Sequence, residues 1–528
     1  MKALIQRIRG ERKPALVRED RTPLKQKISY GVGHVFNDLC IQAWFSYILI
    51  YFTKVIKLSP VNAGYIFVVS QIADAISTPL IGYACDKRMS KRIEKRYGNK
   101  KIWHLIGSAG IALIWPFLYS PCPYCGEKAE EWVLLTYYGV LTALFSFFWP
   151  MVEISHLSLM PIVARRAKDA LELGAIRSAL KLGCGVYVYI VTWILLGQNS
   201  ETTIDESVQK PFTYQTIIVI ITGGFFAILF HWGVDEIGRS KKIEDEKKAL
   251  QEKQSSRTDD AEKQALDKEL NPLEIIEHSK TSPPKSIKQW FKCPDFYVMM
   301  IVYFTTQNVA NLVQSYFPMY LTETMQFPKE AIAYFPLIIL ISGIISSMLV
   351  KRLNKKFSNR VIFCFGSVLA IISAAWFYFN PMETRNAIYA PTVIMGCGYS
   401  LMVVMSLAMV ADLIGNDKQS SGFVYAFMAF VDKASLGLIV LGLQEYYPHS
   451  TGECIECRDY LRLAFAVLPG VEALIAFVAV AFFFQRTPFQ NIRSPKEKED
   501  KSTEFVCESP YYGEADFINI PSLRSTDV

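Results

Sequence analysis

The chain has 528 residues, of which 51% are hydrophobic and 13% aromatic, and its mean hydropathy is +0.20. A soluble chain of this length divides into domains built from amphipathic elements, whereas here apolar runs of about 20 residues recur, each long enough to cross roughly 30 Å of hydrocarbon. The net charge of +7 does not indicate nucleic-acid binding, because the basic residues lie in short loops between the apolar runs. Composition therefore excludes an ordinary soluble protein and predicts an all-α membrane protein.

Twelve membrane-spanning helices in two six-helix halves are expected. The spans lie near residues 28–53, 61–84, 102–120, 132–160, 171–197, 213–233, 294–320, 330–350, 361–379, 387–412, 420–443 and 461–485. The charged sequence between spans six and seven lacks the apolar residues needed for a core. The predicted organisation is an N-terminal tail (1–27), a first six-helix half (28–237), a linker (238–293), a second six-helix half (294–486) and a C-terminal tail (487–528).

Basic residues mark alternate connections. Lys and Arg concentrate in the N-terminal tail, in the loops after spans two, four and eight, and in the linker, so by the positive-inside rule these segments face the cytoplasm. Both termini are then cytoplasmic, and the basic tail has no apolar core of the kind that a cleavable signal peptide needs. A weak repeat supports two related halves, because an Ile-Ser pair precedes a basic cluster in span two (Ile76-Ser77) and in span eight (Ile341-Ser342).

Polar residues inside the spans are candidates for a site, because a charged side chain at bilayer depth costs about 2.5–3.5 kcal/mol on insertion scales. Several share a helix face at spacings of three or four residues. The candidates are His34, Asn37 and Asp38 in span one, Asp74 and Thr78 in span two, Glu153 in span four, Arg177 in span five, Gln307 and Asn311 in span seven, and Lys433 in span eleven.

Each of these residues has a structural and a functional interpretation. Glu153 and Arg177 can neutralise each other across two helices, and a histidine beside an acid, as at His34, is typically a satisfied hydrogen bonder. Asp38, Asp74 and Lys433 look unpaired in the sequence, and both halves contribute to the set. We therefore expect these three charges to line a hydrated cavity between the halves, with a substrate or a coupling ion in it.

Two C-x-x-C pairs lie in loops expected on the same, non-cytoplasmic side: Cys122 with Cys125 between spans three and four, and Cys454 with Cys457 between spans eleven and twelve. They fit disulfides in an oxidising compartment, a four-sulfur zinc site or a redox active site, in that order of preference. Nucleotide-binding and hydrolase motifs are absent, so neither an enzyme nor a cofactor is expected. The last three residues, ending at Val528, match the C-terminal peptides captured by PDZ-type modules.

Several segments resemble the major facilitator superfamily and, within it, the glycoside–pentoside–hexuronide cation symporters. KISYGVGHVFND is similar to the first helix of the bacterial melibiose-permease type, and QIADAISTPLIG is similar to its second helix. The resemblance covers all twelve spans and implies the major facilitator fold. It also implies a substrate-binding acid at Asp38, a cation-site acid at Asp74 and matching charged positions at Glu153, Arg177 and Lys433.

Two positions depart from that resemblance. Thr78 stands where the family has a second cation-site acid, which weakens a sodium site because a hard cation prefers several anionic oxygens. Leu157 replaces a tryptophan on which a sugar ring would stack. The end of span two resembles the cytoplasmic hinge motif of the superfamily, with Gly82, Asp86, Lys87 and Arg88 as its matching residues.

The segments GHVFNDLC, SPCPYCG, EISHLSLMP and SGFVYAFMAFVDK resemble an animal branch of the superfamily. This resemblance implies a multi-pass protein of lysosome- and melanosome-type membranes that is needed for cysteine import and affects pigmentation. We therefore expect a secondary transporter that moves cysteine from the cytosol into the organelle by alternating access. Asp38 would meet the ammonium and Lys433 the carboxylate of the zwitterion, Asp74 would carry a proton or tune the gate, and Glu153 with Arg177 would form a charge switch.

Three other functions stay open at this point. One is a symporter that couples a sugar or another small metabolite to a cation or proton, although Thr78 argues against sodium. The second is a membrane thiol oxidoreductase that uses the C-x-x-C loops. The third is a scaffold that acts through its C-terminal residues.

Overall fold

The computed structural model describes residues 21–87, 91–126, 129–165, 167–198, 203–238, 240–241, 287–415, 421–448 and 455–483. Within these ranges it contains twelve helices that are long and apolar enough to cross a membrane, and no β-strand. Each expected span overlaps one of them, so the prediction of an all-α, twelve-span fold is confirmed. The spans are Leu24–Val55, Pro60–Cys85, Asn99–Leu118, Glu131–Val163, Glu172–Leu196, Glu206–Gly238, Pro294–Thr324, Ala331–Val350, Asn359–Phe379, Met382–Ile414, Phe423–Glu445 and Ile455–Phe483.

Several spans are built from more than one helical segment. The first half contains α2 (Leu24–Val32), α3 (Val35–Ile50), η1 (Tyr51–Val55), α4 (Pro60–Asp86), α5 (Lys91–Arg96), α6 (Asn99–Leu118), α7 (Glu131–Val163), α8 (Ala167–Leu196), η2 (Glu206–Val208) and α9 (Gln209–Gly233). The second half contains α12 (Ile287–Trp290), α13 (Pro294–Met319), η3 (Tyr320–Thr324), α14 (Ala331–Leu353), α15 (Asn359–Phe379), η4 (Met382–Ile388), α16 (Tyr389–Ile414), α17 (Ser421–Glu445), α18 (Ile455–Arg462), η6 (Leu463–Val467), α19 (Leu468–Val478) and η7 (Ala479–Phe483).

Local sequence signals fix where helices begin and bend. The Ser59 side chain accepts a hydrogen bond from the Asn62 amide at 3.4 Å, and Pro60 occupies the first turn of α4, so the two residues together cap this helix. Proline inside a helix removes a backbone hydrogen bond and bends it. The internal prolines are Pro79, Pro116, Pro150, Pro161, Pro318 and Pro336.

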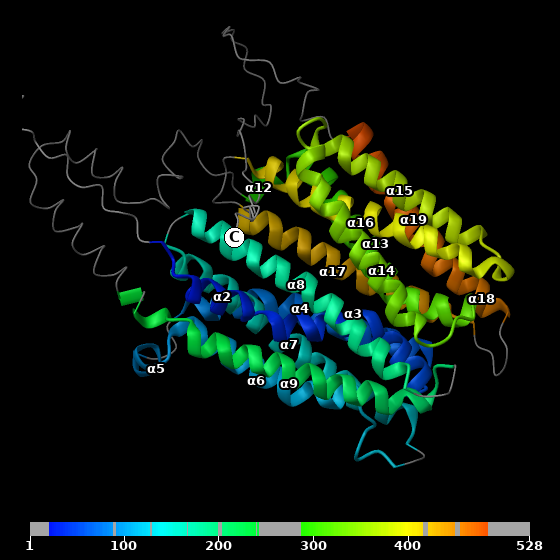
Figure 1. The fold of residues 1–528 in the computed structure, drawn as a ribbon, viewed down its shortest axis with the longest axis horizontal. Helices are drawn as coiled ribbons and strands as arrows, with labels where there is room; N and C mark the ends of the chain where they lie inside the picture. The colour runs from blue at the N-terminus through cyan, green and yellow to red at the C-terminus, as the bar shows by residue number, and fades with distance from the viewer. Residues whose placement is uncertain are drawn as a thin grey trace, which may run out of the picture.

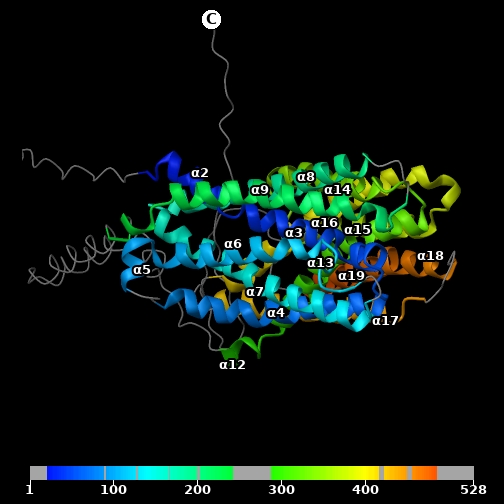
Figure 2. The ribbon, with the colours of Figure 1, turned by 90° about the horizontal axis from the view of Figure 1, so that it is seen from below.

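The two halves lie side by side and meet along three helix pairs (Figures 1 and 2). α3 packs against α13, α4 against α17, and α8 against α14. Glycine permits the close approach, because a Cβ on Gly64 would lie 2.9 Å from Cβ of Gln444, and one on Gly185 would lie 2.8 Å from Cδ2 of Leu340. Any site held between the halves is therefore framed by these six helices.

The two ends of the helix bundle differ in their short helices. Figure 1 shows α5 and α12 at one end and α18 at the other. We call these the α5 end and the α18 end. Since α5 connects spans two and three, and consecutive connections alternate between ends, the connections after spans one, three, five, seven, nine and eleven all lie at the α18 end.

Candidate functional site

The first span is interrupted inside the first half. α2 ends before Gly33, α3 begins after His34, and the two residues between them form a turn. His156 Nε2 donates to the Tyr30 carbonyl at 2.7 Å, and His104 Nε2 donates to the Gly33 carbonyl at 2.8 Å. Irregular backbone at membrane depth is tolerated where protein groups satisfy it. The two histidine side chains supply those groups, and the break places His34 at the start of α3.

A row of polar side chains extends from this break toward α8 and α7. His34 Nδ1 lies 2.9 Å from Asp38 Oδ2, Arg177 Nη2 lies 3.2 Å from His34 Nε2, and the same Nη2 lies 3.3 Å from Glu153 Oε1. A guanidinium only donates, so His34 Nε2 accepts and the ring proton of a neutral His34 sits on Nδ1. Asn37, fully buried, adds its Nδ2 at 3.4 Å from His34 Nε2. The side chains of His34 and Asp38 are buried, whereas those of Arg177 and Glu153 are partly exposed.

A second charged contact joins the two halves. Lys433 Nζ on α17 forms an ion pair with Asp74 Oδ2 on α4, and Thr78 Oγ1 donates to the other Asp74 oxygen at 3.0 Å. The side chain of Lys433 is 20% exposed and that of Asp74 8% exposed. The Lys433 ammonium also lies 5.6 Å from the ring centroid of Trp149.

Our interpretation of Asp74 and Lys433 as unpaired charges is therefore wrong, because the two side chains form an ion pair. Asp38 lies against the ring of His34, and within the described residues neither of its carboxylate oxygens has a hydrogen-bond partner. Sequence patterns show which residues share one helix face, but they do not show which faces of distant helices meet. The expected link between Glu153 and Arg177 is present, with Arg177 also contacting His34.

The charged groups of both contacts lie close enough to Glu153 to form one cluster around it. His34, Arg177, Lys181 and Lys433 all lie within electrostatic range of its carboxylate. Asp74 is in range of Glu153 as well, and Asp432 is in range of both Asp74 and Lys433. The cluster therefore presents anionic and cationic groups from both halves at the junction between them, which suits a small solute that carries both charges.

The polar residues of span seven divide into two groups. Gln307 lies four residues after Tyr303 on the same helix, and Tyr303 is in electrostatic range of Asp432 and Glu153. Asn311 is partly buried one turn further along α13. Gln314 instead reaches the first half, where its Nε2 donates to Ser46 Oγ at 3.0 Å.

Sequence reasoning missed a buried acid in span twelve. Glu472 on α19 is 6% exposed and its Oε2 has no hydrogen-bond partner among the described residues. Its helix packs against α13, where Asn308 donates to Ser435 Oγ on α17 at 3.2 Å. An acid in the middle of the apolar run LPGVEALIAFV is a signal that the sequence already carries.

The hinge-like residues at the end of α4 are described only in part. A Cβ on Gly82 would meet no atom within 4 Å, and the Lys87 ammonium lies 4.2 Å from the ring centroid of Tyr83. Arg88 and the side chain of Asp86 lie outside the described part of the structure. The gating role of this motif stays a prediction.

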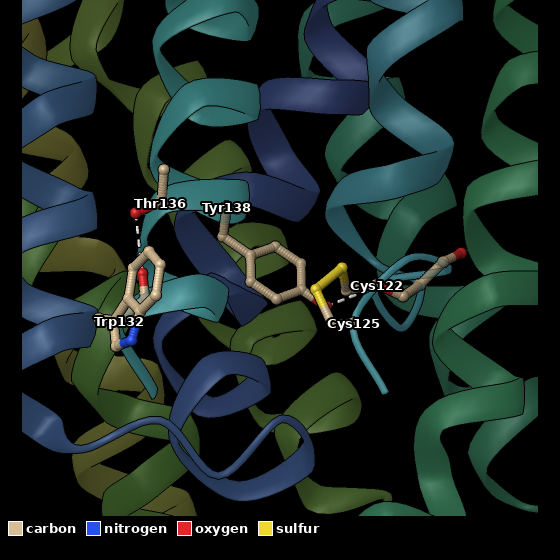
Figure 3. Close-up of a disulfide and its surroundings, with 6 residues drawn as sticks. Cys122, Cys125, Trp132, Thr136 and Tyr138 are labelled. Carbon is tan, nitrogen blue, oxygen red and sulfur yellow. Dashed lines mark hydrogen bonds between the residues drawn. A yellow bond between two sulfur atoms is a disulfide. The ribbon is translucent and has the colours of Figure 1, made fainter. Parts of the chain in front are cut away.

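The loop at the α18 end between spans three and four is closed by a disulfide between Cys122 and Cys125 (Figure 3). Beside it, Tyr138 Oη donates to the Ser120 carbonyl at 2.7 Å. Cys457 is also disulfide-bonded, whereas Cys454 and Val528 lie outside the described residues. Within the described ranges, no group of three or more His, Cys, Asp or Glu side chains is placed to hold a metal ion.

Comparison with known proteins identifies the family. The family model described as Major Facilitator Superfamily matches residues 31–438. Major facilitator superfamily domain-containing protein 12 of Homo sapiens is 35% identical over 460 residues, which are 85% of this chain and 90% of that protein. The Mus musculus protein of the same name is 33% identical and covers 87% of this chain and 93% of its own length. The uncharacterised symporter YjmB of Bacillus subtilis is 23% identical, and the match covers 92% of this chain and 97% of that protein.

Solved structures agree at the level of the fold. The inward-open conformation of the xylose transporter XylE from E. coli aligns with a TM-score of 0.58 at 13% identity, over 85% of this chain and 94% of that one. The nucleoside transporter NupG aligns with a TM-score of 0.55 at 13% identity, over 87% of this chain and 99% of NupG. With a family model matched over most of its length, and with animal relatives above 30% identity, this chain belongs to the major facilitator superfamily of membrane transporters.

Proposed function

We propose that this protein is an alternating-access transporter that imports cysteine from the cytosol into lysosome- and melanosome-type organelles. The observation that carries the proposal is the cluster of opposite charges where the halves meet. A zwitterion offers an ammonium to Asp38 and a carboxylate to Lys433, and each half contributes one of these groups. Whole-chain similarity to animal members of the superfamily supports the same assignment.

Substrate binding would change the charged contact between the two halves. A substrate carboxylate that binds Lys433 competes with Asp74, because one ammonium cannot fully neutralise two carboxylates. Asp74 then loses its counter-charge and takes up a proton. Such an exchange links substrate binding to proton binding at the contact between α4 and α17, so the coupling ion we propose is a proton. Arg177, which contacts both His34 and Glu153, would shift between these two partners as Asp38 engages the substrate.

The orientation that we propose rests on the charges of the loops. Basic loops at the α5 end favour a cytoplasmic position for that end and for both termini, and the disulfide at Cys122 and Cys125 would then face the organelle lumen. Gln307 and Asn311 would complete the substrate site from span seven.

Uptake of radiolabelled cysteine by purified protein in liposomes tests the function. We expect uptake to rise when a proton gradient directed into the liposomes is imposed. We expect it to fall at least tenfold in D38N and in K433A. A matched control is K57A, because Lys57 is exposed at the α18 end and forms an ion pair with Glu206 of the same half. Uptake that is intact in the D38N/K433A double variant would overturn the assignment.

A second candidate is cation-coupled symport of a sugar or another metabolite, which is favoured by similarity to bacterial symporters over nearly the whole chain. Sodium-dependent sugar uptake, with no cysteine uptake, would support it. A thiol oxidoreductase is a third candidate, because Cys122 and Cys125 form a disulfide in the loop between spans three and four. Dithiol oxidation by the wild type, and none by C122S/C125S, would support that candidate.

A further inference from the structure

The first span of each half ends in the same irregular turn. α3 passes into the π-helical turn η1, with the sequence YFTKV, and α13 passes into η3, with the sequence YLTET. Each turn is followed by a non-glycine residue with positive φ, Lys57 at 62° and Gln326 at 51°. π turns are rare and positive φ is uncommon outside glycine, so their joint appearance at equivalent places marks two copies of one structural unit.

The hydrogen bonds of the two turns correspond one to one, with each residue of η3 lying the same number of positions after its counterpart in η1. In both copies an amide after the turn donates back into it, and a threonine hydroxyl donates to the carbonyl four residues earlier. The pairs are Leu58 N to Phe52 O with Phe327 N to Leu321 O, both at 2.9 Å, and Thr53 Oγ1 to Leu49 O at 2.8 Å with Thr322 Oγ1 to Pro318 O at 3.0 Å.

A buried tyrosine anchors each turn to its own half. Tyr51 and Tyr320 open the two turns and are both fully buried. The Tyr51 ring centroid lies 4.9 Å from that of Tyr119, and the Tyr320 ring centroid lies 4.6 Å from that of Phe465. Each turn therefore moves with the half to which it belongs.

Equivalent residues of the two turns contact each other across the halves. Lys54 in η1 and Glu323 in η3 occupy the same position of the repeat, and their Nζ and Oε2 atoms lie 3.0 Å apart. Parallel repeats are related by an axis along the membrane normal, so repeat-equivalent residues near that axis face one another. The two copies carry opposite charges here, and they attract.

Neutral hydrogen bonds continue the same seam toward the charged cluster. Gln314 donates to Ser46 at 3.0 Å, and Ser315 Oγ donates to the Phe45 carbonyl at 3.1 Å. Lys54 and Glu323 stand outside these bonds, toward the α18 end, with side chains that are 28% and 31% exposed. The ion pair is therefore a partly exposed part of the α3–α13 seam.

We propose that Lys54 and Glu323 form a latch that holds the α18 end closed, and that its release lets the halves part there. This inference rests on the proposed alternating access but not on the identity of the substrate. Exposed ion pairs shift an equilibrium by about twofold to fivefold. A contact of that strength favours the closed end and still opens in every transport cycle, whereas a fully buried pair would hold the end shut.

Distance measurements on the full chain in lipid nanodiscs test the latch. Spin labels on non-canonical amino acids at Thr203 and Glu383 report the separation of the halves, because both residues are exposed at the α18 end, in opposite halves. We expect K54E and E323K each to raise the ratio of open to closed populations several-fold, since each places like charges face to face. The double variant K54E/E323K restores the pair in reverse and returns the ratio to that of the wild type.

The matched control is K57E, which breaks the Lys57–Glu206 ion pair within the first half at the same end and leaves the ratio unchanged. The latch is rejected if single reversals leave the distance distribution at its wild-type form, or if K57E shifts it equally. It is also rejected if the folded double variant, with a wild-type gel-filtration profile, behaves like the single variants. Since no substrate is added, failure of cysteine uptake and failure of the latch are separate outcomes.

Discussion

Removing Lys433 is expected to destabilise the protein more than removing Asp74, although both changes break the same ion pair. K433A leaves Asp74 and Asp432, which are within electrostatic range of each other, without their shared cation. D74N leaves Lys433 with Asp432 still in range and with the Trp149 ring centroid 5.6 Å from its ammonium. The geometry therefore predicts an asymmetry, which a simple count of lost contacts does not.

The magnitude follows from burial. Removing one partner of a fully buried ion pair costs about 3–5 kcal/mol, and the side-chain exposures of 20% for Lys433 and 8% for Asp74 reduce this. We expect about 2–3 kcal/mol for K433A and about 1 kcal/mol or less for D74N. At about 2–4 °C per kcal/mol for a unit of roughly 200 residues, K433A lowers Tm by about 4–12 °C.

Thermal unfolding of purified protein in one detergent, followed by tryptophan fluorescence, measures these shifts. The double variant D74N/K433A should be more stable than K433A alone, because it removes the uncompensated carboxylate at Asp74. Both single variants and the double variant should lose cysteine uptake. The reasoning is refuted if D74N destabilises at least as much as K433A, or if the double variant is no more stable than K433A.

Three further predictions follow from other contacts. H104L and H156L each remove a donor to the broken first span and should lower Tm and cysteine uptake, whereas H104Q and H156Q, whose amide replaces Nε2, should recover both in the same assays. T78D supplies a second carboxylate beside Asp74, and sodium-stimulated uptake should appear in it; an unchanged response to sodium would contradict the role given to this position. C122S/C125S removes a disulfide that closes a short loop and stabilises the protein by about 2 kcal/mol through the entropy of the unfolded chain. The double variant should therefore have a lower Tm with uptake intact. Loss of uptake would instead favour the redox function.

The fold could be predicted from the sequence because bilayer spanning is a local property. Each run of about 20 apolar residues carries its own signal, and the expected spans all overlap helices of the structure. The pairing of charges is not local. Asp74 and Lys433 come from helices at opposite ends of the chain, and only their packing shows that they meet.

The irregular backbone segments also could not be predicted from the sequence. The turn at Gly33 and His34 interrupts an apolar span without changing its hydropathy, and its stability depends on histidines from two other helices. The repeated turns beginning at Tyr51 and Tyr320 are clearer as structure than as sequence, because few of their residues are identical. The predicted repeat in spans two and eight was a weaker sign of the same relation between the halves.

The central claim is most directly tested by cysteine uptake into liposomes that contain only this protein, with a proton gradient imposed and then abolished. We predict that cysteine accumulates above its external concentration while the gradient lasts, and that D38N and K433A each reduce the initial rate at least tenfold. Absence of cysteine uptake by folded, correctly oriented protein would contradict the account, and so would uptake at the wild-type rate in both variants.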